Sequence, residues 1–177
     1  MFVPLNYLKK ILKVDETSRT GLRWKKRTLD KFGWNKKFAD KEAGTLKFSS
    51  KGVPAYQVKI NFNGIAKKYY VHRIIYYIYH GHIDDKLVID HKNGNPLDNR
   101  IKNLRLCTYS QNGQNTKIYS NNKIGYKNII KQKNGYRVRF TVNKKTLNFG
   151  LFKNLKKAII FANKKRKELY GEFSRHK

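Results

Sequence analysis

Hydrophobic and polar residues alternate over residues 56–62, where Tyr56, Val58, Ile60 and Phe62 are separated by polar side chains. This two-residue period is typical of a half-buried β-strand. The dipeptide Asn63-Gly64 follows, and both of its residues tolerate the positive φ angles of a tight hairpin turn. We therefore predict a return strand over residues 65–71.

A different spacing begins after that strand. Ile74, Ile75 and Ile78 recur at helical intervals, and Gly81 provides a stop, so residues 72–81 are predicted to form a helix. Two short apolar runs, 87–89 and 104–107, are predicted as strands on either side of a loop rich in Asn, Gly and Pro. A polar helix is predicted over residues 110–117.

A second group of strands, followed by a helix, is predicted near the C-terminus. Strands are predicted over 125–130, 136–142 and 147–151, with a turn at Asn143-Lys144-Lys145. Apolar residues then take helical spacing over 155–169, and Gly171 ends the helix. Three antiparallel strands and one helix suit a small independent domain.

The charge of the chain points to a polyanionic partner. The 177 residues hold 41 Lys and Arg against 11 Asp and Glu, a net charge of +30. Residues 121–177 alone carry 17 basic and 2 acidic residues. Such an imbalance favours nucleic acid over an anionic membrane as the partner, and the last third is predicted to be the main electrostatic contact.

Two further properties narrow the class. Cys107 is the only cysteine, so a disulfide framework within the chain and a zinc site of cysteine pairs are both excluded. The sequence has no apolar run long enough to span a membrane, and its first residues do not read as a signal peptide. We expect an intracellular protein.

The segment from Val88 to Asn115 carries the candidate chemistry. Asp90-His91 stands at the end of an apolar run, and Asn112 follows Asp90 by 22 positions. Carboxylate and carboxamide oxygens favour a hard cation such as Mg²⁺ or Mn²⁺, and an imidazole is suited to act as a general base at neutral pH. Taken alone, Asp90-His91 is better explained as a hydrogen-bonding pair between strand and turn.

Four landmarks in order resemble the HNH nucleases of the ββα-metal fold, in particular phage and intron-encoded homing endonucleases. They are His72-Arg73, Asp90-His91, Asn103-Leu104 and an asparagine on the following helix, Asn112. The resemblance implies that His91 is the general base and that Asp90 and Asn112 are metal ligands. It implies for Asn103 a supporting catalytic role, in which its side chain holds the loop that orients His91.

Residues 125–173 resemble the plant ethylene-response-factor (APETALA-type) DNA-binding domain, on the segments Gly125-Tyr126-Lys127, Tyr136–Phe140 and Phe149–Phe152 and the helix that ends at Gly171. In that family the sheet lies in the major groove and the helix packs behind it. If Val138 and Phe140 face the helix, Arg137 and Arg139 face away, where arginines contact bases or phosphates. Lys127, Lys144 and Lys145 complete the predicted DNA contacts. The tryptophans that stack on DNA in the plant domain are missing, so its base preference does not carry over.

The fold class expected is therefore α+β: a ββα-metal HNH core followed by a small three-stranded antiparallel sheet packed on one helix. The expected organisation is a basic N-terminal region (1–41), a nuclease domain (42–118), a linker (119–124) and a DNA-binding domain (125–177). The expected function is metal-dependent cleavage of double-stranded DNA at a specific site by a monomer with one active site, which predicts a nick. Two alternatives stay open: a DNA-binding regulator with an inactive nuclease fold, and an RNA-binding protein.

Overall fold

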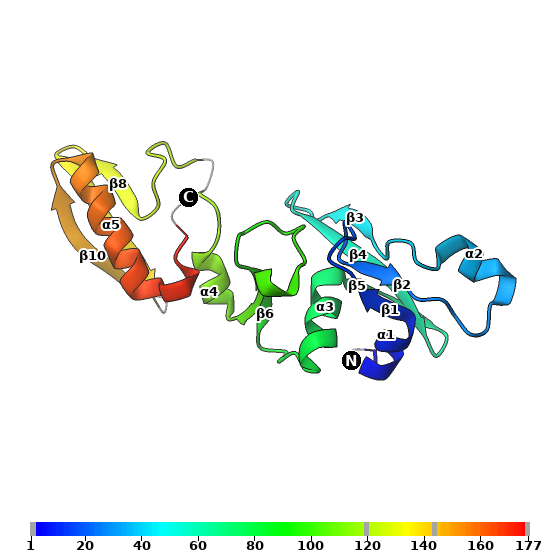
Figure 1. The fold of residues 1–177 in the computed structure, drawn as a ribbon. Helices are drawn as coiled ribbons and strands as arrows, with labels where there is room; N and C mark the ends of the chain where they lie inside the picture. The colour runs from blue at the N-terminus through cyan, green and yellow to red at the C-terminus, as the bar shows by residue number, and fades with distance from the viewer. Residues whose placement is uncertain (1–2, 119–120, 143–144, 176–177) are drawn as a thin grey trace. The chain divides into compact units, whose positions relative to one another are not determined.

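The computed structural model describes residues 3–118, 121–142 and 145–175. The chain divides into two compact units, Met1–Leu106 and Cys107–Lys177, each with a hydrophobic core of its own. Both units mix helices with small sheets, as the α+β expectation requires (Figure 1). No helix within the described ranges is long and apolar enough to cross a bilayer.

The first unit contains most of the predicted nuclease elements. In chain order these are α1 (Leu5–Ile11), β1 (Leu12–Val14), β2 (Leu22–Trp24), η1 (Lys31–Gly33), α2 (Trp34–Phe38), β3 (Thr45–Phe48), β4 (Pro54–Phe62), β5 (Ile65–Tyr70), α3 (Val71–His80), β6 (Val88–His91), η2 (Ile101–Asn103) and β7 (Leu104–Cys107). Strand β1 pairs with β2, β4 lies between β3 and β5, and β6 pairs with β7.

The predicted hairpin and helix are confirmed. Strands β4 and β5 pair in antiparallel register, with Phe62 opposite Ile65, and Asn63 and Gly64 adopt φ angles of 49° and 77° between them. Helix α3 ends at Gly81, whose φ is 72°. Its Ile74 and Ile75 are fully buried, so the helical spacing read in the sequence is the core-facing side of α3.

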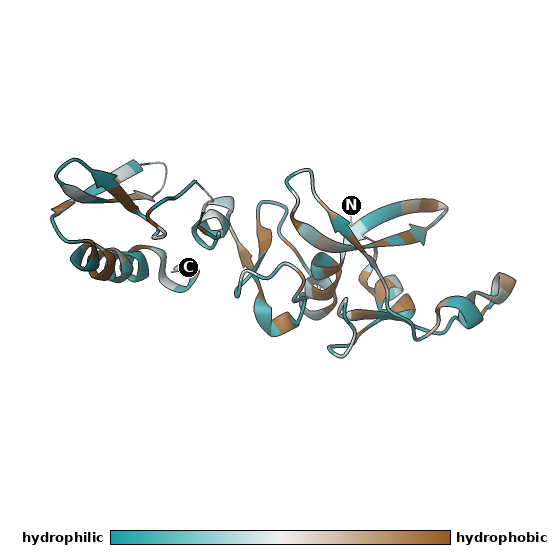
Figure 2. Cartoon of the chain, turned by 90° about the horizontal axis from the view of Figure 1, so that it is seen from above, coloured by the Kyte–Doolittle hydropathy of each residue, from teal (hydrophilic) through white to brown (hydrophobic). Residues whose placement is uncertain are grey.

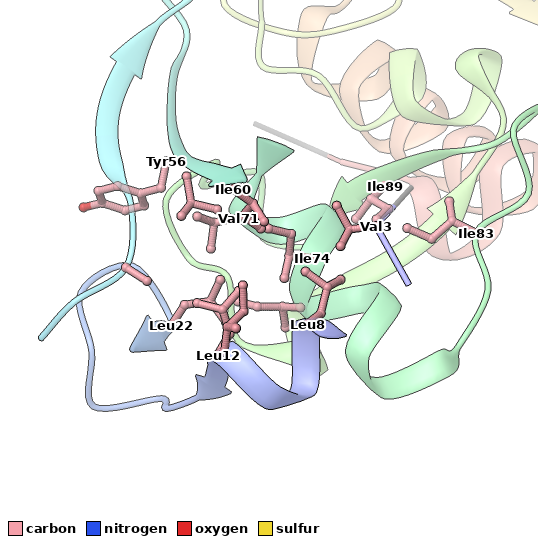
Figure 3. Close-up of a cluster of buried hydrophobic side chains, with 14 of the residues drawn as sticks. Val3, Leu8, Leu12, Leu22, Tyr56, Ile60, Val71, Ile74, Ile83 and Ile89 are labelled. Atoms are coloured by element: carbon pink, nitrogen blue, oxygen red, sulfur yellow. The ribbon is translucent and has the colours of Figure 1, made fainter. Parts of the chain in front are cut away.

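The N-terminal residues form part of the core of the first unit. Leu8, Leu12 and Leu22 pack in the same cluster as Ile60 of β4 and Ile74 of α3 (Figure 3). Residues 3–24 therefore support the elements that carry Asp90 and His91, a structural contribution that their basic composition does not reveal.

The second unit holds α4 (Tyr109–Gln114), β8 (Ile129–Gln132), β9 (Gly135–Val142), β10 (Lys145–Phe152), α5 (Leu155–Tyr170) and η3 (Gly171–Phe173). The three strands form an antiparallel sheet in the order β10-β9-β8. Val138 and Phe140 of β9 pack against Ala158 and Ala162 of α5. The three-stranded sheet packed on one helix is confirmed.

Two details of this unit differ from the sequence-based expectation. The strand expected from residue 125 begins only at Ile129, because Gly125 and Asn128 take positive φ angles of 75° and 65° and form a turn. In β10 the register shifts between Asn148 and Leu151. The shift breaks the simple alternation, and Phe149 and Phe152 pack on the core while Leu147 and Leu151 are exposed. The expected turn at residues 143–145 lies mostly outside the described residues.

Candidate active site

Asp90 and His91 are the last two residues of β6, and both are buried, with 6% and 8% of their surfaces exposed. Strand β6 enters the core through Ile89 and pairs with β7. A polar pair at the inner end of a core strand needs polar partners, since burial without them is costly. The partners found define the candidate site.

Asp90 is held by an arginine on the neighbouring strand. The Nε and Nη2 atoms of Arg105 donate to Oδ2 of Asp90 at 2.9 and 2.8 Å. Arg105 is itself 9% exposed. Sequence reasoning missed this residue, although an arginine between Leu104 and Leu106 on an apolar strand signals a buried carboxylate partner nearby.

His91 is held by Asn99, which sequence reasoning also missed. Oδ1 of Asn99 lies 3.2 Å from Nε2 of His91, and Nδ2 of Asn99 donates to the backbone oxygen of Thr20 at 2.9 Å. Because the amide nitrogen is committed to Thr20, its oxygen accepts from Nε2–H of the imidazole. This tautomer places the basic lone pair of His91 on Nδ1.

The surroundings keep His91 neutral. Burial lowers the pKa of His91 below its ordinary value, against the opposing influence of the Asn99 hydrogen bond and of the Asp90 and Asp98 charges. The ring of His72 lies edge-on at 5.2 Å from that of His91. Burial, and then the proximity of His91, lower the pKa of His72 to about 3. Neither imidazole carries a charge at neutral pH, so His91 is in the form that accepts a proton.

The loop after His91 is tied down by Asn103. Oδ1 of Asn103 accepts from the backbone nitrogen of Asn93 at 3.0 Å, and its Nδ2 donates to the backbone oxygen of Asp98 at 2.7 Å. Hydrogen bonding by Arg100 lowers the pKa of Asp98 to about 2. The Asn103 side chain thus joins two points of the loop that follows His91. Such a contact is what a loop-holding role requires.

Asn112 lies in α4, in the second compact unit. The helix begins with a capping box in which the Thr108 side chain accepts from the nitrogen of Gln111, and the Gln111 side chain accepts from the nitrogen of Thr108. Asn112 follows within the first turn. Its meeting with Asp90 remains a prediction.

A cleft in the first unit reaches His91. Its volume is about 250 Å³. The residues that line it include Tyr70, His72, His91 and Pro96, together with Phe48 and neighbouring residues of β3 and β4. Although His91 is mostly buried, this opening gives it contact with the outside.

The predicted DNA-binding residues fall into two groups. Arg137, Arg139 and Lys145 are exposed on the sheet of the second unit, and the two arginines alternate with the buried Val138. Lys127 is only partly exposed, because its Nζ donates to the backbone oxygen of Thr116. Burial and the proximity of Arg166 lower the pKa of Lys127 to about 8. Lys144 lies outside the described residues.

Sequence comparison agrees with this arrangement. A profile of the family described as HNH endonuclease matches residues 69–114, which span α3 to α4. "Protein 3.8" of Escherichia phage T7 is 33% identical over 97 residues, which cover 54% of this chain and 79% of the phage protein. Residues 69–114 of this chain therefore form an HNH endonuclease domain.

Two proteins whose names describe them as HNH endonucleases are also similar to this chain. The "Uncharacterized HNH endonuclease L560" of Acanthamoeba polyphaga mimivirus is 35% identical over 60% of this chain and 56% of its own length. The solved structure titled "DNA binding and cleavage by the HNH homing endonuclease I-HmuI" matches at 24% identity and a TM-score of 0.35, over 55% of this chain and 48% of that chain. This chain spans only about half the length of these last two relatives.

Proposed function

We propose that this HNH protein is a metal-dependent endonuclease that hydrolyses a phosphodiester bond of double-stranded DNA at a specific site, as an intracellular enzyme of the phage homing or nicking type. The observation that carries the proposal is His91: a buried imidazole, kept neutral, fixed through Nε2 by Asn99 and open to a cleft. A neutral, oriented imidazole is what a general base for water needs.

In the proposed reaction the lone pair of His91 removes a proton from the attacking water. Asn103 keeps the loop in place and Asn99 keeps the ring from rotating, so the base is positioned before substrate binds. Asp90 and Asn112 would hold Mg²⁺ or Mn²⁺. A bound divalent cation supplies charge neutralisation at the phosphate and at the departing oxygen.

The donor chemistry fits a hard cation. One carboxylate and one carboxamide offer only oxygen ligands, which suit Mg²⁺ or Mn²⁺ and leave positions for water and phosphate. Within the described ranges, no group of three or more His, Cys, Asp and Glu side chains gathers that could hold a metal. Arg105 shares Oδ2 of Asp90 and thereby opposes a second positive charge, so we expect a weakly held ion.

The second unit is proposed to bind the DNA duplex. Arg137 and Arg139 project from the face of β9 opposite α5, where no acidic side chain of the sheet strands competes with phosphate within the described residues. An exposed arginine face on the sheet is what the resemblance of residues 125–173 to the ethylene-response-factor domain implies. Arginines on such a face can contact phosphates or guanine edges.

The proposal is tested with supercoiled plasmid. The chain carries one Asp90-His91 pair, so we expect a monomer to nick one strand in Mg²⁺ and to leave open circles at low enzyme concentration, with the cut ends mapped by sequencing. The monomeric state is checked by sedimentation under the same conditions. Clean linear product from a demonstrated monomer would contradict the one-site argument.

One contact favours the alternative function, a DNA-binding regulator. Arg105 neutralises the buried Asp90 carboxylate from within the chain, so Asp90 has a structural partner that does not depend on nuclease chemistry. Tight DNA binding by the purified protein with no cleavage in Mg²⁺ or Mn²⁺ would support the regulator. Preference for RNA over a DNA duplex of equal length would support the RNA-binding alternative.

If the second unit binds DNA through its basic residues, the binding constant should depend strongly on salt concentration. The slope of log K against log salt should be about −0.9 for each phosphate contacted. Arg137→Gln and Arg139→Gln should each make the slope shallower by about one contact. Lys164→Gln is the matched control, because Lys164 is exposed on α5 rather than on the sheet. Equal slopes for all three variants and the parent would contradict the sheet as the DNA-binding face.

A further inference from the structure

An apolar tip with a basic border is formed by residues 25–41 of the first unit. Leu29 and Phe32 are 78% and 103% exposed, so neither contributes to the core. In Figure 1 the η1 and α2 elements lie apart from α1 and α3, which fill that core. Figure 2 shows hydrophobic and hydrophilic residues side by side in this segment.

Phe32 is held in a backbone conformation that disfavours it. Its φ and ψ are 61° and 31°, in the left-handed region, and Gly33 follows at φ 65°. A bulky side chain is strained there, whereas glycine is not. Such strain persists only where the surroundings impose it, and it concentrates at functional positions.

The surroundings do impose it. The Asn35 side chain closes the loop, since its Oδ1 accepts from the nitrogen of Arg27 at 2.7 Å and its Nδ2 donates to the oxygen of Arg27 at 2.8 Å. Asp30 accepts from the nitrogen of Asn35 at 2.8 Å. Trp34 is covered by the Arg27 guanidinium at 3.7 Å and touches Trp24 of β2 edge-on. Leu29 and Phe32 are therefore presented from a braced loop.

The charge of the segment identifies its partner. Residues 25–41 contain seven basic and two acidic residues. In the sequence Lys25, Lys26 and Arg27 precede the apolar tip, Lys36, Lys37 and Lys41 follow it, and Lys31 lies between Leu29 and Phe32. Proteins that bend DNA insert apolar side chains between base steps while neighbouring cations hold the phosphates. A protein partner with an apolar pocket would not require this excess of positive charge.

We propose that Phe32, supported by Leu29, is a wedge that enters the minor groove of the DNA substrate and unstacks one base step. This inference rests on the proposed function, because the partner is the same duplex that the enzyme cuts. The wedge would distort the DNA at a point away from the base pairs next to His91. The choice of cut site would then depend partly on how easily the DNA sequence at the wedge deforms.

The experiment uses the full-length protein and a duplex that carries the cut site mapped on plasmid. The duplex bears a fluorophore pair at its ends to report bending, and 2-aminopurine to report unstacking. Phe32→Gly should weaken binding about tenfold, the scale of one lost base–aromatic contact, and should abolish both fluorescence changes. Because glycine relieves the positive φ, the same variant should melt at the same temperature as the parent or above it.

Phe32→Leu and Ile160→Ser separate the outcomes. Leucine keeps an apolar wedge and should retain most of the bending. Ile160 is also an exposed apolar residue, at 62%, but it lies on α5, and its loss should change nothing. Unchanged bending by Phe32→Gly in a protein whose parent form still cuts DNA would overturn the wedge alone. Loss of self-association by Phe32→Gly in the absence of DNA would instead assign the tip to a second copy of the chain. A parent protein that neither binds nor cuts the duplex would remove the proposed function itself.

Discussion

His91→Ala should lower the rate of DNA cleavage by about 10²–10⁴-fold, the usual contribution of a positioned general base. Binding of the same DNA should be nearly unchanged, because His91 is buried and the proposed contacts to the duplex lie elsewhere. The two quantities are measured separately, with binding assayed without divalent cation so that the parent does not cut. His82→Ala is the control, since His82 is an exposed histidine on the loop after α3.

The dependence of the cleavage rate on pH is a second test of His91 as the general base. Since burial lowers the pKa of His91, the base becomes neutral at a lower pH than an ordinary imidazole does. The cleavage rate of the parent should therefore rise with pH and then reach a plateau. The midpoint of the rise should lie below about pH 6.5, and the rate should stay level between pH 7 and 8. A rate that continues to climb through that interval would mean that another group accepts the proton.

The local elements of this fold could be predicted from sequence because their signals are local. The hairpin at Asn63-Gly64, helix α3 with its stop at Gly81, and β7 follow from period and turn chemistry alone. Strand β10 was less predictable, because the register shift after Asn148 moves later side chains to the other face. A single inserted residue of this kind leaves no clear mark in the hydrophobic pattern.

The candidate site was predictable only in part, for a related physical reason. The motif predicts Asp90, His91, Asn103 and Asn112 as site residues, but it does not show what holds them. Asn99 links His91 to Thr20, a residue 79 positions away in the chain. That contact depends on how the N-terminal residues pack under α3, which is a tertiary property. Arg105 could have been inferred, since a buried strand arginine requires an anion, and the one carboxylate on the paired strand is Asp90.

Asp90→Asn should lower the free energy of unfolding by about 3–5 kcal/mol, the scale for breaking a buried ion pair by removing one partner. The side chains of Asp90 and Arg105 are 6% and 10% exposed, so the guanidinium loses its carboxylate where water cannot easily replace it. Denaturant unfolding measures the change. The control is Lys13→Met: Lys13 pairs with Asp40 at 3.2 Å, but the two side chains are 44% and 71% exposed, and its loss should cost less than about 1 kcal/mol.

Arg105→Met then distinguishes a metal ligand from a purely structural carboxylate. Removal of the guanidinium leaves Asp90 with an uncompensated charge in the core, and a divalent cation can compensate it in place of Arg105. If Asp90 binds the ion, Mg²⁺ should raise the melting temperature of Arg105→Met more than that of the parent, and should not raise that of Asp90→Asn. Equal shifts in all three proteins would show that the ion binds away from Asp90. The carboxylate would then have only a structural role, and the proposed hydrolysis would need another site for its metal.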